Sequence, residues 1–352
     1  MAARRLDKVG PGAAYTRACA PRSVREKSPA IATAAPVSSP RPRIGLALGS
    51  GSARGWAHLG VLRALVQAGL APDVVCGASI GALVGAAHVL GAREAFEQWV
   101  LGLSRRDVVS YMDFSLGGGL LKGERLADFL RRHTADRDFE ALETPFAAVA
   151  TALQTGEEVW LRQGSVTDAV RASIGLPGLF TPVWRDGRLL VDGGLVNPVP
   201  VSLARALGAD IVIAVDLNAD KLGRHLYRTA EAATPPAPGN GWLHALQNSL
   251  SGWRTAPPAP PEPAEGAAAP PPPLPSMVDI LTTSIHIMQV RITRSRMAGD
   301  PPEFTIAPRL AHLGLLDFHR AREAIEAGEL AAQDCVAALR QLGLATAPAP
   351  AA

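Results

Sequence analysis

The pentapeptide at residues 77–81, GASIG, places a serine, Ser79, between two glycines in the pattern G-x-S-x-G. A β-branched pair at residues 74–75 precedes it, and a run of small apolar, helix-compatible residues follows. A strand, a sharp turn and a helix form the setting of a nucleophile elbow, in which Gly77 and Gly81 leave room where a Cβ would collide. The hydroxyl then stands at a helix N-terminus, which favours negative charge. The pattern predicts a nucleophilic serine, although these five residues alone fit an ordinary Gly/Ser turn equally well.

Acyl transfer also needs hydrogen-bond donors for the oxyanion that forms during attack. Residues 49–55, GSGSARG, follow a predicted strand and form a glycine-rich loop whose backbone N–H groups can turn toward an anion. We assign the oxyanion hole to four residues of this loop: Gly49, Gly51, Ser52 and Arg54. Within it we expect Gly51 and Ser52 to donate N–H groups, and Arg54 to add a positive charge near the developing anion.

The third stretch that bears on this chemistry is residues 192–194, DGG, after another predicted strand. Asp192 on a tight turn made by Gly193 and Gly194 can reach the serine hydroxyl and act as its base. An aspartate that merely forms a turn is common. Each of the three stretches has such an ordinary interpretation, but their shared position at the ends of predicted strands favours one common site.

Two other kinds of site fit parts of the pattern. A glycine-rich loop after a strand is also typical of dinucleotide binding, but Arg54 stands where that fingerprint has its third glycine, and no G-x-x-x-x-G-K-[ST] occurs. An α/β-hydrolase triad would need a histidine late in the chain. Because His286, His312 and His319 are available, the sequence leaves a triad open. We interpret His58, just after the loop, as structural.

The elements that must position these residues follow from hydrophobic periodicity. Strands are predicted at residues 43–48, 74–75, 146–153, 159–161, 189–191, 211–215 and 304–306. Helices are predicted at residues 56–68, 92–103, 123–133, 166–174, 199–207, 277–297 and 317–342, besides the helix after Ser79. Strand, loop, helix and strand over residues 43–75 form a βαβ unit, which implies parallel strands. The most hydrophobic strand, at residues 211–215, is expected at the centre of a covered sheet.

Composition limits the classes of function. Of 352 residues, 47% are hydrophobic and 19% are charged, which suits a large globular core. The net charge of +3 is uneven, because residues 1–43 carry nine Lys/Arg and two acidic residues, which leaves the remainder mildly acidic. The basic pI therefore gives no support for a nucleic-acid partner. Three widely spaced cysteines, Cys19, Cys76 and Cys335, form no disulfide framework or metal motif and favour a reducing compartment.

The chain divides by composition into folded and unfolded parts. Residues 1–42 are rich in Ala, Pro, Ser and Arg, and we expect a disordered basic tail without the apolar segment of a secretory signal. Ten prolines in residues 257–275 predict a disordered insertion at residues 229–275. Residues 43–228 and 276–344 are then two parts of one catalytic domain, and residues 345–352 a disordered tail. No stretch reaches the roughly 20 uninterrupted apolar residues of a membrane span.

Together the three motifs resemble those of bacterial patatin-like phospholipases of the neuropathy-target-esterase type. That family carries a G-x-G-x-x-[RK]-G oxyanion loop, a G-x-S-x-G elbow and a D-G-[AG] turn, matched here at residues 49–55, 77–81 and 192–194. The likeness extends over residues 44–217 and returns at residues 291–320. One departure is that Ser50 and Ser52 replace glycines found in many relatives, a change that keeps the backbone N–H groups.

The resemblance implies the α/β class, with a three-layer α/β/α patatin-like fold around a mainly parallel sheet. It implies a Ser79–Asp192 dyad that hydrolyses carboxylic esters of lipids, phospholipids or lysophospholipids, through an acyl-enzyme and without a metal or organic cofactor. Such a protein is expected in the cytoplasm, with contact to the inner membrane face left open and its oligomeric state unknown. Two alternatives remain: a catalytically weak regulatory or interaction protein on the same fold, suggested by the Pro-rich insertion, and a nucleotide-binding Rossmann protein.

Overall fold

The computed structural model describes residues 41–107, 128, 131–132, 137–177, 179–219 and 277–345. Most of the tail predicted at residues 1–42, the whole insertion predicted at residues 229–275 and nearly all of the tail predicted at residues 345–352 lie outside this part of the chain. The helix predicted at residues 123–133 is described only at residues 128 and 131–132, which are helical. The predicted domain boundaries therefore stay predictions.

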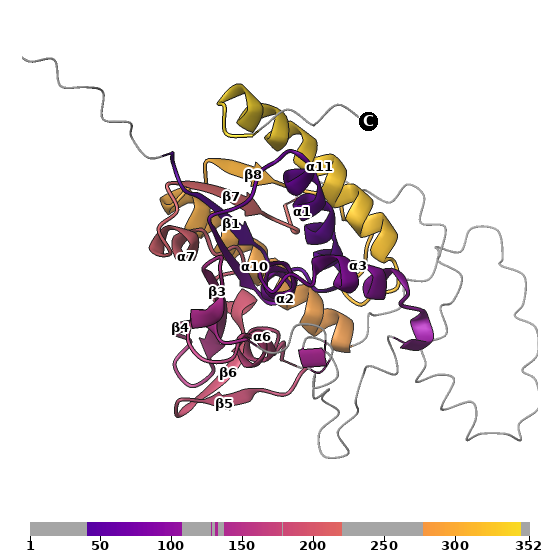
Figure 1. The fold of residues 1–352 in the computed structure, drawn as a ribbon. Helices are drawn as coiled ribbons and strands as arrows, with labels where there is room; N and C mark the ends of the chain where they lie inside the picture. The colour runs from indigo at the N-terminus through magenta and orange to yellow at the C-terminus, as the bar shows by residue number, and fades with distance from the viewer. Residues whose placement is uncertain are drawn as a thin grey trace, which may run out of the picture. The chain divides into compact units, whose positions relative to one another are not determined.

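Eight strands of the described residues form one sheet (Figure 1). In spatial order it contains β5 (Val183–Arg185), β6 (Arg188–Asp192), β3 (Phe146–Ala152), β2 (Val74–Ala78), β1 (Ile44–Leu48), β7 (Ile211–Val215) and β8 (Phe304–Ile306), and β4 (Glu158–Leu161) pairs with β3. The five strands from β3 to β8 in this order run parallel. The pairs of β3 with β4, β3 with β6 and β5 with β6 are antiparallel. The sheet is therefore mainly parallel, as predicted.

Helices cover both faces of this sheet, because alternate residues of each buried strand point to opposite sides. Leu46 of β1 and Val75 of β2 belong to one core, whereas Ala47 and Cys76 belong to the other. The first core is completed by α1 (Ala57–Gln67), α2 (Ile80–Val89), α3 (Arg93–Leu101), α6 (Val166–Ser173) and α11 (Ala321–Gln341). The second is completed by α7 (Val201–Ala206), with Met297 of α10 (Met277–Gly299) packed against it. This is the predicted three-layer α/β/α arrangement.

The structure adds to or departs from the predictions at three single elements. The strand predicted at residues 189–191 is present as β6, and it forms a hairpin with β5. Strand β5 was not predicted, because Trp184 is 68% exposed and the segment therefore shows no burial pattern. The strand at residues 211–215 is internal, since β7 pairs with both β1 and β8, but it lies next to the edge strand β8 and not at the centre of the sheet. The hydrophobicity of a strand indicates that both of its faces are covered and does not give its position in the sheet. The helix expected from residue 56 begins as a 3-10 turn, η1 (Ser52–Trp56), within the glycine-rich loop.

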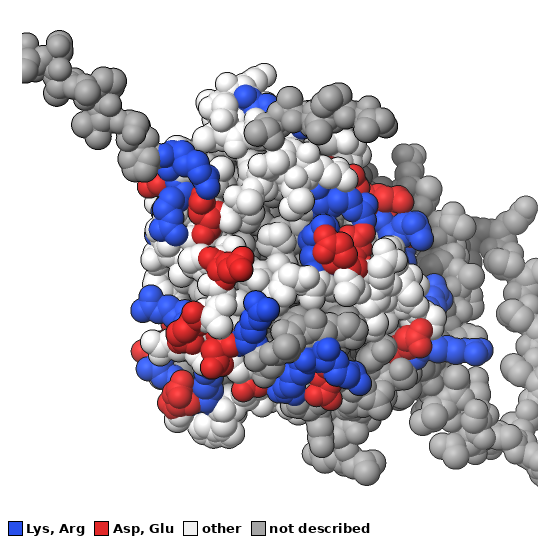
Figure 2. All heavy atoms as spheres, viewed as in Figure 1, with Lys and Arg blue, Asp and Glu red and all other residues white. Residues whose placement is uncertain are grey.

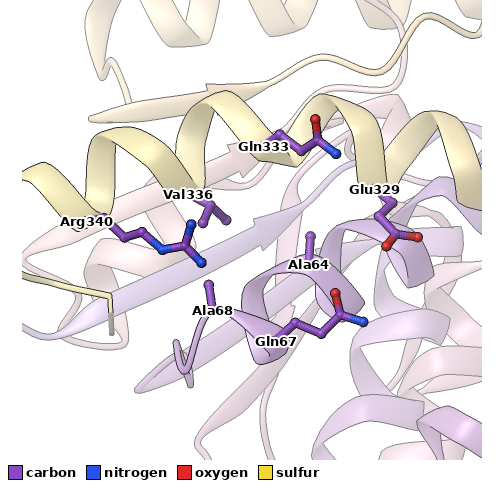
Figure 3. Close-up of a pocket in the computed structure, with 7 residues that line it drawn as sticks. All are labelled: Ala64, Gln67, Ala68, Glu329, Gln333, Val336 and Arg340. Atoms are coloured by element: carbon purple, nitrogen blue, oxygen red, sulfur yellow. The ribbon is translucent and has the colours of Figure 1, made fainter. Parts of the chain in front are cut away.

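A pocket of about 220 Å³ lies between α1 and α11 (Figure 3). It is lined by Ala64, Gln67, Ala68, Glu329, Gln333, Val336 and Arg340. Its α1 residues belong to the C-terminal end of that helix, whereas the glycine-rich loop precedes the N-terminal end. The pocket is therefore separate from the predicted site.

Candidate active site

Ser79 occupies a strained turn between β2, which ends at Ala78, and α2, which begins at Ile80. Its φ of 57° and ψ of −125° are unusual for a residue with a side chain, and such strain is concentrated at functional sites. The turn can be this tight only because Gly81 lacks a Cβ, which would lie 2.1 Å from the backbone oxygen of Leu48. The predicted strand, turn and helix around Ser79 are therefore present, and the turn brings Ser79 to the carboxyl end of β1.

Strand β3 sets the distance between the serine and Asp192. Ala78, the residue before Ser79, is in register with Val149, and Asp192 is in register with the next residue, Ala150. The ends of β2 and β6 thus meet, and the Ser79 hydroxyl donates a hydrogen bond to Asp192 Oδ2 over 2.5 Å. The backbone of Asp192 is fixed in turn, since its carbonyl accepts a 2.8 Å hydrogen bond from the Thr151 hydroxyl.

The carboxyl group of Asp192 is fully buried. Burial raises its pKa to about 6, because a charge is poorly solvated there, while hydrogen bonds from Ser79 and from the Gly194 N–H act in the opposite direction. The Gly194 N–H lies 2.7 Å from Oδ1, so each carboxylate oxygen has one donor. The side chain is therefore held in place with a proton affinity between those of an ordinary carboxylate and a histidine.

The glycine-rich loop has two N–H groups to offer an anion. Those of Gly49 and Ser50 are already used, since they donate to the carbonyls of Val215 and Pro198 at 3.1 and 2.8 Å. Within the described part of the chain, the N–H groups of Gly51 and Ser52 have no hydrogen-bond acceptor. The prediction that Gly49 is part of the oxyanion hole is therefore wrong for its N–H group, whereas Gly51 and Ser52 remain the candidate donors.

Arg54 is fully buried. One guanidinium nitrogen donates to the carbonyl of Leu217 at 3.5 Å, and the other lies 3.2 Å from His286 Nδ1 on α10. The expected placement of its charge beside the developing oxyanion finds no support in these contacts. Instead Arg54 ties the loop to the segment after β7 and to α10.

Two residues that the sequence did not suggest hold Ser50 of the loop. Gln289 of α10 donates to the Ser50 hydroxyl at 3.3 Å, and Asn218 donates to the Ser50 carbonyl at 3.2 Å. Both are buried. The Asp-Gly-Gly turn packs on the same spot, since a Cβ on Gly194 would lie 2.5 Å from the Ser50 hydroxyl and 2.6 Å from the Gln289 amide. The loop, the elbow and the turn, with α10 beside them, therefore form one contiguous site.

Similarity to known proteins bears on the family of this chain. Residues 46–205 match the sequence profile of the patatin-like phospholipases. An uncharacterized NTE family protein of Mycobacterium bovis is 33% identical over 340 residues, covering 85% of this chain and 93% of the relative. The chain belongs to the patatin-like phospholipase family. The family and the fold predicted from the sequence are thereby confirmed, and the patatin-like chain falls among lipid hydrolases.

More distant relatives cover less of their own length. A second uncharacterized NTE family protein, from Mycobacterium tuberculosis, is 30% identical over 297 residues, which are 82% of this chain and 46% of the relative. The mouse patatin-like phospholipase domain-containing protein 7 is 34% identical over 183 residues, 50% of this chain and 14% of the relative. The crystal structure of VipD from Legionella pneumophila aligns with a TM-score of 0.48 and 14% identity, over 85% of this chain and 67% of that one.

Four histidines of the described residues have partners other than the Ser79–Asp192 pair. His58 Nε2 lies 2.8 Å from the Gly49 carbonyl, and burial lowers the pKa of this ring to about 4, so it is a neutral donor that holds the loop. His286 contacts Arg54, His312 lies 3.6 Å from Glu323, and His319 lies 3.2 Å from Arg105. Among the described residues no histidine is hydrogen-bonded to Ser79 or Asp192, so the geometry favours a dyad over a triad.

One more buried hydroxyl supports the elbow of the patatin-like chain. Ser173, at the end of α6, accepts a hydrogen bond from the Ser79 N–H at 2.9 Å and donates to the Val149 carbonyl at 2.6 Å. It thereby links the elbow to β3, the strand that pairs with β6, which carries Asp192. Nothing in the sequence singles out Ser173, because a serine at the end of an amphipathic helix is ordinary.

Two features of the described residues concern metal binding and membrane crossing. No group of three or more His, Cys, Asp and Glu side chains there could hold a metal ion. Within the same residues, no helix has the length and apolar character required to cross a bilayer. On the face seen in Figure 2, acidic and basic side chains alternate in small mixed clusters.

Proposed function

We propose that the protein is a serine hydrolase of lipid carboxylic esters, of the phospholipase A or lysophospholipase type, which uses Ser79 and Asp192 as a catalytic dyad. The observation that carries the proposal is the 2.5 Å hydrogen bond from the Ser79 hydroxyl to a buried Asp192 carboxylate at a nucleophile elbow. Membership of a lipid hydrolase family supports an acyl ester of a lipid as the substrate.

In the first half of the reaction, Ser79 Oγ attacks the ester carbonyl carbon while its proton passes to Asp192 Oδ2. The carbonyl oxygen becomes an oxyanion, for which the N–H groups of Gly51 and Ser52 are the donors. When the tetrahedral intermediate collapses, the bond to the lipid alcohol breaks and the departing oxygen takes the proton from Asp192. The fatty acyl group is left as an ester on Ser79.

In the second half, a water molecule repeats the attack on the acyl-enzyme. Asp192 takes a proton from the water and returns it to Ser79 Oγ as the free fatty acid leaves. With a pKa of about 6, Asp192 is mostly ionised at pH 7 and is still a stronger base than an unperturbed carboxylate. This explains how the dyad can work without a histidine.

The test is release of free fatty acid from lysophosphatidylcholine, a diacyl phospholipid and triacylglycerol. We expect activity on the phospholipids that is lost in Ser79→Ala and Asp192→Asn, while both variants remain folded. Ser104→Ala, at an exposed serine, is the matched control and keeps full activity. A folded wild-type protein without activity on any ester would instead support the catalytically weak regulatory alternative.

A further inference from the structure

Helix α10 has polar side chains on its buried side and large apolar side chains on its exposed side. Its buried side consists largely of polar side chains: His286, Gln289 and Thr293, with Val290 beside them. Its exposed side carries four large apolar side chains, Ile280, Leu281, Ile287 and Met288, each between 43% and 56% exposed. A surface helix normally shows the opposite arrangement. Burial among the described residues therefore does not account for these four apolar side chains.

The exposed residues lie along one stripe of the helix. At about 100° per residue, Ile280, Leu281, Ile287 and Met288 span an arc of about 120°. Arg291 and Arg294 continue the same stripe about 5 and 9 Å beyond Met288 along the axis. We call these six residues the outer face of α10. Among the described residues neither arginine has an acidic partner, so the outer face is apolar at one end and cationic at the other.

The opposite side of the same helix contacts the catalytic loop. Gln289 donates to the Ser50 hydroxyl, and His286 is hydrogen-bonded to Arg54. The outer face is therefore separated from the loop by one helix, a thickness of about 10 Å. That distance is shorter than one leaflet of a bilayer, which is about 15 Å of hydrocarbon.

We propose that the outer face of α10 binds the surface of a bilayer that contains anionic phospholipid. Apolar side chains next to arginines on a helix that lies flat are the features that bind a membrane interface, with the apolar part at the acyl boundary and the guanidinium groups at phosphates. The inference rests on the proposed function in so far as a bilayer presents the lipid substrate. It assigns a partner to a surface outside the catalytic dyad.

The experiment measures binding of the full chain to vesicles by co-sedimentation, in a Ser79→Ala background so that the lipid stays intact. Vesicles of phosphatidylcholine with phosphatidylglycerol are compared with pure phosphatidylcholine. We expect Arg291→Gln with Arg294→Gln to weaken binding to the anionic vesicles about 30-fold, at about fivefold for each charge. Ile287→Ser with Met288→Ser, which removes two half-exposed apolar side chains, is expected to weaken it by a similar factor on both kinds of vesicle.

Matched controls come from exposed residues on other elements. Leu330→Ser with Leu342→Ser removes two even more exposed apolar side chains, on α11 and at its end. Arg309→Gln with Arg322→Gln removes two exposed charges. Both control pairs should bind as the parent does, and the thermal unfolding midpoint checks that every variant is folded. Folded α10 variants that bind vesicles like the parent, or a parent that does not bind, would overturn the inference. Neither result bears on ester hydrolysis, which is measured separately on monomeric substrate with Ser79 intact.

Discussion

Asp192→Asn should make the protein more stable at neutral pH, even though it removes the proposed base. The carboxyl group is fully buried, and its pKa of about 6 lies about two units above the ordinary value of 3.8. Two units correspond to about 3 kcal/mol of differential stability between the protonated and ionised forms. An asparagine amide is neutral, so the folded variant is spared the desolvation of a buried charge.

The effect has a definite pH window. Because the pKa is higher in the folded state than in the unfolded state, wild type is relatively favoured below about pH 4, where Asp192 is protonated in both states. It loses stability as the pH rises from about 4 to 6, and the loss is complete above that range. The free energy of unfolding of Asp192→Asn, minus that of wild type, should therefore grow by about 3 kcal/mol between low pH and pH 8.

Urea unfolding of both proteins at several pH values measures this difference directly, since all other titrating groups are common to both. Asp186→Asn, at an exposed turn, controls for the removal of one negative charge and should give a much smaller change. If the difference between Asp192→Asn and wild type stays flat from pH 4 to 8, the carboxyl group is not desolvated in the way that its burial implies.

Two further predictions concern the rate and the elbow. For wild type, kcat/KM on a monomeric ester should rise with pH around a midpoint of about 6 and then level off, because Asp192 must be ionised to accept the serine proton. A value of kcat/KM that is independent of pH from 5 to 8 would argue against this role. Gly81→Ala should destabilise the protein by about 3 kcal/mol and abolish activity, because its Cβ would lie 2.1 Å from the Leu48 oxygen. Gly85→Ala in the same helix, where the nearest atoms are side chains at 3.1 Å or more, is the control and should be tolerated far better, as thermal unfolding would show.

Much of the fold could be predicted because its signals are local. The alternation of Ile44, Leu46 and Leu48 with smaller residues, and the placement of glycines around Ser79, depend on neighbours in sequence. The strands at Ile211–Val215 and Phe304–Ile306 were predicted to the residue for the same reason. The hairpin strand β5 was missed because its exposed tryptophan carries no burial pattern.

The supports of the site could not be predicted, because their partners are distant in sequence. The Gly49 N–H group donates to the Val215 carbonyl, and the Arg54 guanidinium group contacts the Leu217 carbonyl and His286. Nothing near the loop indicates these contacts. The same is true of Gln289, which reaches Ser50 from a helix 239 residues away. A motif specifies which residue types can do the chemistry, while the tertiary fold decides which backbone groups remain free to do it.

The central claim, that Ser79 is an activated nucleophile, is tested most directly by labelling with a fluorophosphonate probe and locating the adduct by mass spectrometry. The account predicts one adduct on wild type, at Ser79, no labelling of Ser79→Ala, and strongly reduced labelling of Asp192→Asn. A folded wild-type protein that does not react, or a Ser79→Ala variant that is labelled as strongly as wild type, would contradict it.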